Sequence, residues 1–306
     1  MGKLAFIFPG QGSQYVGMGK DLFASSPAAR MVFEEADSIM GFPLSTVCFD
    51  GPEDELRQTR TTQPAIFVHS MAVARILTSL RPDGVAGHSL GEYSALVVAG
   101  ALSLTDGLRL VRLRGELMQR AGEERRGTMA AVVGLDPAAV EDLCREASAA
   151  GVVQPANLNA PGQIVISGSV EGVRKGMELA KQRGAKLVRE LVVSGAFHSP
   201  LMQTAGDGLR RELDRTSLRD AEIPVYANVT ATPVTRASEI RELLHRQLTS
   251  PVRWEESIQA MAADGVTAYY EIGPGKVLQG LVKRIIPGAT LGGFDTMKDI
   301  QTQSIP

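Results

Sequence analysis

Gly87-His88-Ser89-Leu90-Gly91 stands between two apolar segments, the short run Gly84–Ala86 before it and Tyr93–Ala99 after it. A strand that enters a sharp turn between two glycines and continues as a helix is the nucleophile elbow. Ser89 would then lie at a helix N-terminus, where free backbone N–H groups and the helix dipole favour a developing negative charge. The pattern predicts a catalytic serine at the edge of a sheet. The alternative is a glycine-rich loop in which Ser89 only caps the helix.

The composition argues against several classes of protein. Lys and Arg number 32 against 34 Asp and Glu, and the formal net charge of −2 gives no support to binding of nucleic acid or a membrane surface. No apolar run has the length of a membrane span, and the first residues lack the pattern of a signal peptide. Cys48 and Cys144 lie far apart, which argues against a disulfide framework and a cysteine-based metal site. We therefore expect a protein of the reducing cytoplasm, with a monomer as the default.

Strands and helices alternate in the first part of the chain. The pattern predicts a strand at Leu4–Phe8, helices at Pro27–Met40 and Gln63–Leu80, the elbow, and a helix over Leu104–Ala121. Such alternation predicts an α/β fold with a mostly parallel, covered sheet.

A charged stretch bounded by glycines, Gly122–Gly127, predicts a crossing into a second domain. The elements expected after it are strand Met129–Val133, helix Pro137–Ala149, strands Val153–Asn159 and Gln163–Gly168, helix Val170–Gln182 and strand Lys186–Val192. The order βαββαβ is typical of a ferredoxin-like unit. We expect a small subdomain over residues 125–195, inserted into a large discontinuous subdomain of residues 1–124 and 196–306.

The large subdomain is expected to resume with further helices and strands. They are helix Pro200–Arg215, strand Pro224–Asn228, helices Ser238–Leu248 and Trp254–Asp264, strand Ala268–Ile272 and helix Lys276–Ile285. The polar tail Asp295–Pro306 is expected to fray.

A serine nucleophile needs a general base, and the chain has four histidines. His69 lies in an apolar helix, His88 adjoins the nucleophile and should point away from it, and His245 lies in a charged helix and should be solvated. His198 lies in a loop between a strand and a helix, where catalytic groups collect, and is the candidate base.

No motif points to an acid that would orient this histidine. Asp106, Asp136 and Asp207 are available; otherwise a backbone carbonyl or an amide holds the imidazole, and Gln247 offers an amide. Arg114 would suit a substrate carboxylate if it were buried. By itself, the charge pattern of its helix favours a solvated face instead.

Four motifs together resemble a known family. They are Phe8-Pro9-Gly10-Gln11-Gly12-Ser13-Gln14, Gly87-His88-Ser89-Leu90-Gly91-Glu92, Gly195-Ala196-Phe197-His198 and Glu271-Ile272-Gly273-Pro274-Gly275-Lys276. In this order and at this spacing the set resembles the malonyl-CoA:acyl carrier protein transacylases, relatives of the polyketide synthase acyltransferases, over roughly residues 4–290.

The resemblance implies a role for each matching residue. Ser89 would be the nucleophile and His198 the general base and acid. Gln11 and the backbone N–H of Leu90 would form the oxyanion hole. Arg114 would hold the malonyl carboxylate, and the main-chain carbonyl of Gln247 would orient the histidine. Phe197 would crowd an α-methyl group and so favour malonyl.

The resemblance also implies a reaction. Malonyl would pass from malonyl-CoA to Ser89 and then to the phosphopantetheine thiol of holo-acyl carrier protein, supplying fatty acid synthesis without a cofactor or metal. The fold implied is a hydrolase-like large subdomain with a ferredoxin-like small one and the site between them. The alternatives are a free-standing polyketide acyltransferase, a serine esterase or thioesterase with an acid between Ser89 and His198, and a non-catalytic module that binds carrier protein.

Overall fold

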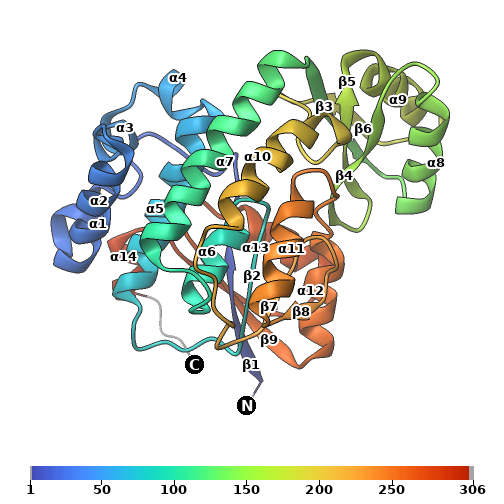
Figure 1. Ribbon diagram of the computed structural model, residues 1–306. Helices are drawn as coiled ribbons and strands as arrows, with labels where there is room; N and C mark the ends of the chain where they lie inside the picture. Colours follow the sequence, from blue (N-terminus) through green and yellow to red (C-terminus); the bar gives the residue numbers. More distant parts are fainter. Residues whose placement is uncertain (1, 303–306) are drawn as a thin grey trace.

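The computed structural model describes residues 2–302, and its larger layer is a six-stranded sheet (Figure 1). In spatial order its strands are β10 (Thr290–Phe294), β9 (Val266–Ile272), β1 (Lys3–Phe8), β2 (Gly84–Gly87), β7 (Val225–Tyr226) and β8 (Pro233–Val234). Each neighbouring pair is parallel except β7 and β8, which are antiparallel. The predicted mostly parallel sheet is therefore confirmed.

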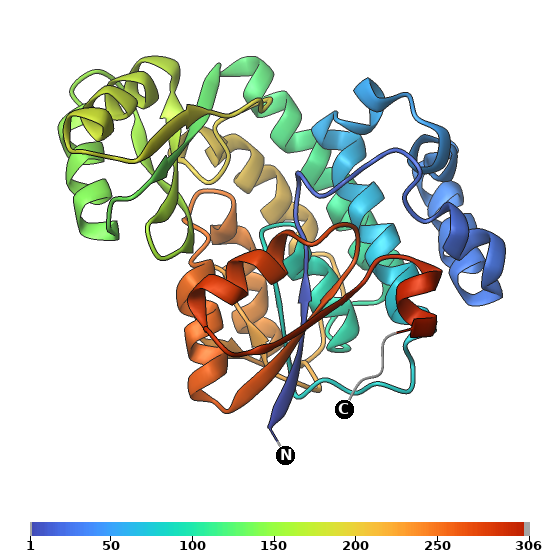
Figure 2. The same cartoon turned by 180° about the vertical axis from the view of Figure 1, so that it is seen from behind.

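Both faces of this sheet are buried, as β1 illustrates. Successive side chains of a strand point to opposite faces. Phe6 and Phe8 belong to one hydrophobic cluster with residues of α2, α5, α6 and α7, whereas Ala5 and Ile7 belong to another with residues of α12 and α13. Because helices cover both faces, the strand is almost continuously apolar, as is typical of parallel sheets. Figure 2 shows β9 and β10 running alongside β1.

Helices make up most of the rest of this larger part. They are α1 (Lys20–Ser25), α2 (Pro27–Met40), α3 (Leu44–Asp50), α4 (Glu53–Leu56), α5 (Thr59–Ile76), α6 (Gly91–Val98), α7 (Leu104–Glu124), the 3₁₀ turn η1 (Pro200–Met202), α10 (Gln203–Leu213), α11 (Ala237–Gln247), α12 (Trp254–Ala263), α13 (Val277–Ile285) and α14 (Met297–Thr302). None of the helices in residues 2–302 has the length and apolarity that crossing a membrane requires.

The second layer is a separate four-stranded antiparallel sheet in the order β4-β5-β3-β6. Its elements are β3 (Gly127–Val133), α8 (Pro137–Ala147), β4 (Val153–Ala160), β5 (Gln163–Ser169), α9 (Val170–Gln182) and β6 (Leu187–Glu190). It has a hydrophobic cluster of its own and stands beside the larger part at the end of α7 (Figure 1). The βαββαβ order of a ferredoxin-like unit is confirmed.

The two connections between the layers pass very close to each other. A Cβ atom on Gly122 would lie 2.1 Å from the carbonyl oxygen of Ser194, so only glycine fits there. The charged stretch that predicted the crossing is helical up to Glu124, and the first strand of the small sheet begins at Gly127.

Several predicted boundaries are wrong. Helix α5 covers Thr59–Ile76, four residues earlier at both ends than predicted, and the helix predicted at Pro200–Arg215 divides into η1 and α10. The strand predicted at Pro224–Asn228 shortens to β7 because the backbone N–H of Asn228 donates to a side chain, Glu92 Oε2, in place of a strand.

The tail does not fray where the structure describes it. Thr296 and Asp299 cap α14 reciprocally: the Asp299 carboxylate accepts from the N–H of Thr296 at 2.9 Å, and the Asp299 N–H donates to Thr296 Oγ1 at 3.2 Å. The rest of that prediction, residues 303–306, lies outside the described residues. Elements missed from the sequence are α1, α3, α4, β8, β10 and α14.

Candidate active site

Ser89 occupies a sharp turn between β2 and α6, as the elbow pattern predicted. Its φ of 51° lies in the left-handed region, which non-glycine residues rarely adopt. A Cβ on Gly87 would lie 1.9 Å from the carbonyl carbon of Gly91, and one on Gly91 would lie 2.1 Å from the oxygen of Phe8. The two glycines are therefore required by close packing between the turn, its helix and β1.

The hydroxyl of Ser89 has two hydrogen-bond partners from distant parts of the chain. Oγ lies 2.8 Å from His198 Nε2, and Arg114 Nη2 donates to the same Oγ at 2.9 Å. His198 has a φ of 58° and is buried in the loop between β6 and η1. The sequence-predicted nucleophile and base are thus brought into hydrogen-bond contact.

The other ring nitrogen of His198 determines which tautomer is present. Nδ1 lies 2.9 Å from the main-chain oxygen of Gln247. A carbonyl can only accept, so Nδ1 carries the proton and Nε2 of the neutral ring accepts from the Ser89 hydroxyl. The partner of this imidazole is therefore a backbone carbonyl, and Asp106, Asp136 and Asp207 do not contact it. The acid that a serine esterase would place there is absent from the described contacts of His198.

The surroundings keep His198 neutral. Burial, together with the positive charge of Arg114, lowers the pKa of the imidazole to about 3. A neutral imidazole can accept a proton from Ser89 across the physiological pH range.

Arg114 on α7 is completely buried, so the prediction from charge pattern that it lies on a solvated helix face is wrong. Its Nη1 donates to Gln63 Oε1 at 2.7 Å and its Nη2 to Gln247 Oε1 at 3.0 Å, while the guanidinium lies over the Tyr93 ring, 5.6 Å from its centre. Its Nε has no hydrogen-bond partner among the described residues. A buried cationic donor without an acceptor is costly unless a ligand supplies one.

A buried polar network that the sequence did not reveal holds the elbow in place. Asn228 Oδ1 accepts from the backbone N–H of Ser89 at 2.7 Å, and Asn228 Nδ2 donates to the oxygen of Gly87 at 2.7 Å. Gln247 Nε2 donates to the oxygen of Ser89 at 2.9 Å and to Glu92 Oε2 at 2.8 Å. Burial raises the pKa of the Glu92 carboxyl to about 7, although Gln247, Asn228 and Arg114 oppose the increase.

Gln154, on β4 of the small sheet, was also missed. Its Nε2 donates to the main-chain oxygen of His198 at 2.8 Å and to that of Thr249 at 3.2 Å. It thereby ties the base to the small sheet. A signal existed only for Glu92, which directly follows the elbow, and for Asn228, which ends a predicted strand beside it.

Gln11 and Leu90 both line the cleft at Ser89. The Gln11 side chain donates from Nε2 to Thr59 Oγ1 at 3.2 Å, and Thr59 Oγ1 lies 2.7 Å from Ser194 Oγ. The N–H of Ser89 is already taken by Asn228, whereas Leu90 begins the helix, where the first N–H groups have no acceptor within the helix.

Phe197 is buried and lines the same cleft, which has a volume of about 130 Å³. The opposite wall comes from the small subdomain and the segment after it, with Met129, Asn157, Leu191 and Val193. The cleft therefore lies between the two layers and has room for a small acyl group.

The rings of the remaining histidines have no described hydrogen bond with the Ser89 hydroxyl. His88 Nε2 lies 2.9 Å from Asn159 Oδ1, and His69 is buried with Nε2 3.1 Å from Asp295 Oδ1. His245 is half-buried beside Arg210, not solvated as predicted. Residues 2–302 contain no cluster of three or more His, Cys, Asp or Glu side chains that could hold a metal ion.

Comparison with known proteins agrees with this geometry. The sequence profile of the family described as "Acyl transferase domain" matches residues 5–290. The malonyl CoA-acyl carrier protein transacylase of Bacillus subtilis is 50% identical over 288 residues, covering 93% of this chain and 91% of the relative.

Solved structures are equally similar. The acyl carrier protein S-malonyltransferase of Vibrio cholerae has a TM-score of 0.95 at 41% identity, covering 98% of this chain and 99% of that one. A malonyl-transacylase solved in complex with its type II PKS acyl-carrier protein has a TM-score of 0.94 at 40% identity, covering 98% of each chain.

Proposed function

This chain belongs to the acyl transferase domain family, and from that premise we propose that it transfers malonyl from malonyl-CoA to the phosphopantetheine thiol of holo-acyl carrier protein. The reaction supplies extender units for fatty acid synthesis and needs no cofactor beyond its two substrates. The observation that carries the proposal is that one hydroxyl, Ser89 Oγ, contacts both a base, His198 Nε2, and a buried cation, Arg114 Nη2.

In the first half-reaction, Ser89 Oγ attacks the thioester carbon of malonyl-CoA while its proton passes to His198 Nε2. The imidazolium that forms keeps its Nδ1–H on the main-chain oxygen of Gln247, 2.9 Å away. When the tetrahedral intermediate collapses, the carbon–sulfur bond breaks and His198 returns the proton to the sulfur of CoA. In the second half-reaction the phosphopantetheine thiol gives its proton to His198 and attacks the malonyl ester, and Ser89 Oγ leaves with that proton.

The oxyanion of each tetrahedral intermediate lies, in this proposal, against Gln11 and the backbone N–H of Leu90. Both residues line the cleft, and Leu90 stands at the start of α6, where the helix dipole favours negative charge. Removing such a donor in comparable acyl-transfer sites costs roughly 3–4 kcal/mol of transition-state stabilisation.

Arg114 is the group that selects the acyl chain. The malonyl carboxylate accepts from the guanidinium, and the unpartnered Nε supplies a donor that no described residue uses. Since Nη2 lies only 2.9 Å from Ser89 Oγ, the arrangement suits a carboxylate on a short acyl chain.

Phe197 discriminates between malonyl and its α-methylated form. It lies next to the base and narrows the cleft of about 130 Å³, so an α-methyl group on the malonyl unit meets its ring. One methyl group is worth only about 1–3 kcal/mol of discrimination, so methylmalonyl would be a slow substrate and not an excluded one.

The organisation of the chain follows the same proposal. We propose that the chain passes into the small subdomain after residue 124 and returns to the large one after residue 195, because all four strands of the small sheet lie between Gly127 and Glu190. A monomer is the oligomeric state proposed, because Ser89, His198 and Arg114 are already brought into contact within a single fold. Cys48 and Cys144 are both buried and free, which fits the reducing cytoplasm.

The test is a transfer assay with malonyl-CoA and a holo-acyl carrier protein, read by mass spectrometry of the carrier protein. We expect malonyl-carrier protein to form faster than free malonate, and Ser89→Ala to abolish its formation. Release of malonate without transfer would identify a thioesterase instead. A carrier protein from a type II polyketide pathway is the second acceptor to offer, because one relative was solved with such a partner at 40% identity.

A further inference from the structure

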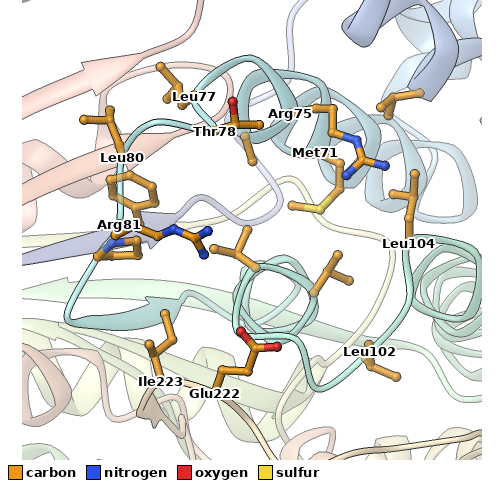
Figure 3. Close-up of a pocket in the computed structure, with 16 residues that line it drawn as sticks. Met71, Arg75, Leu77, Thr78, Leu80, Arg81, Leu102, Leu104, Glu222 and Ile223 are labelled. Carbon is orange, nitrogen blue, oxygen red and sulfur yellow. The ribbon is translucent and has the colours of Figure 1, made fainter.

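A second pocket lies at the opposite edge of the large sheet from Ser89. Ser89 follows the carboxyl end of β2, whereas this pocket is lined by the segment that precedes β2 and by the ends of α5 and α6. Figure 3 shows it in close-up, and its volume is about 500 Å³. That volume falls within the range of small-molecule sites, about 300–1,000 Å³.

Much of the wall of this pocket is apolar. Its floor contains buried side chains of the main hydrophobic core, and its sides are half-buried aliphatic groups; they include Phe6, Val32, Met71, Val97, Val98 and Leu104. Such a wall favours an apolar ligand or the apolar part of an amphiphile, because burial of hydrocarbon against it removes both surfaces from water.

Three charged side chains, Arg75, Arg81 and Glu222, stand around this apolar wall (Figure 3). Arg75 comes from the last turn of α5 and Arg81 from the loop before β2. Within residues 2–302 neither guanidinium has a hydrogen bond or an ion pair, and the Glu222 carboxylate has none either. This part of the surface thus offers two unpaired cations and one unpaired anion.

We propose that this pocket binds an amphiphilic anion, with its hydrocarbon tail against the apolar wall and its carboxylate or phosphate head between Arg75 and Arg81. A guanidinium forms charge-assisted, often bidentate hydrogen bonds with either head group. The Glu222 carboxylate repels the anionic head. This repulsion places the head on the side of the two arginines and lowers the affinity of the pocket for the anion. The site is independent of the cleft at Ser89, and the proposal does not depend on the activity assigned there.

The test is isothermal titration calorimetry of the full chain with decanoate, decyl phosphate and decanol, each below its critical micelle concentration. We expect one site per chain for at least one of the two anions. Decanol should bind at least about tenfold more weakly than that anion. The comparison of the two anions identifies the head group that the arginines prefer.

Variants locate the site. The double variant Arg75→Gln, Arg81→Gln should lose about tenfold or more in affinity for the anion, while Glu222→Gln should bind it more tightly. Arg120→Gln on the exposed side of α7 is the matched control and should leave the affinity unchanged. Because all these side chains are exposed and unpaired, we expect an unchanged Tm.

Three results would overturn the proposal. The first is equal binding of decanol and the anions, and the second is full affinity in the double arginine variant. The third is displacement of the anion by malonyl-CoA, which would place it in the cleft at Ser89. Ala74→Phe fills part of the pocket and gives a second, independent test, since it should weaken anion binding without removing a charge.

Discussion

Replacement of Arg114 by alanine should change which acyl group the enzyme accepts. In the account above the guanidinium holds the malonyl carboxylate, which acetyl-CoA lacks. A hydrogen bond to a charged group contributes about 1.5–3 kcal/mol, so a bidentate pair contributes roughly 3–6 kcal/mol. Allowing for the desolvation of both charges, we expect the ratio of kcat/KM for malonyl-CoA to that for acetyl-CoA to fall by about 100-fold or more.

The ratio of the two substrates is the quantity to measure, because Arg114 also donates to Ser89 Oγ at 2.9 Å. Loss of that contact affects acylation by both thioesters and cancels in the ratio. The assay is the rate of Ser89 acylation by each thioester, followed by rapid quenching and mass spectrometry of the intact protein.

The matched control is Arg112→Ala, two residues earlier on the same helix, where the side chain is half-exposed and paired with Glu116. This variant should keep the wild-type ratio. Arg114→Ala also leaves Gln63 and Gln247 without their donor, so its fold must be checked by circular dichroism. A well-folded Arg114→Ala protein with the wild-type preference for malonyl would show that Arg114 does not hold the malonyl carboxylate.

Three further predictions concern the base and the network beneath the elbow. His198→Ala should slow acylation by about 100-fold or more. The wild-type acylation rate should stay level from pH 8 down to pH 5, because burial lowers the His198 pKa to about 3. An inflection of that rate near pH 6.5 would contradict the second prediction. Asn228→Ala removes the acceptor of the Ser89 N–H and should lower kcat far more than it raises KM. Asn228→Asp keeps an acceptor at that position and should partly restore kcat. Equal kcat values for the two variants would argue against a positioning role. Glu92→Gln should become more stable relative to wild type as the pH rises from about 4.5 to 8. The pKa of this carboxyl is about 7 in the folded state against 4.5 for the free group, so its contribution to stability is greatest below pH 4.5 and falls by about 3 kcal/mol as it ionises. Chemical denaturation at pH 5 and pH 8 measures the difference in free energy of unfolding between the variant and wild type. The same difference at both pH values would contradict this prediction.

The elbow could be predicted from sequence because its determinants are local. Two glycines, a preceding strand and a following helix fix the position of Ser89 within five residues. The ferredoxin-like order was readable for the same reason, since each strand and helix carries its own periodicity. The expectation that Arg114 binds the substrate came only from resemblance, because a charged residue on an amphipathic helix is usually solvated.

The network around Ser89 could not be predicted in this way. Asn228 lies 139 residues from Ser89 along the chain, and the contact between Gln247 and Ser89 spans 158 residues. No local pattern encodes such contacts; they arise from the parallel sheet, which brings the end of β7 beside the end of β2. Similarly, β10 was missed because two of the five residues in its sequence, Thr-Leu-Gly-Gly-Phe, are glycines, which are depleted in strands.

Whether Ser89 carries the malonyl group is tested by mass spectrometry of the chain after brief exposure to malonyl-CoA without carrier protein. We expect a mass increase of about 86 Da, the formula C₃H₂O₃, located on the peptide that contains Ser89 and removed when holo-acyl carrier protein is added. The Ser89→Ala protein should show no increase. A stable adduct on another residue, or release of CoA with no adduct at all, would contradict this expectation.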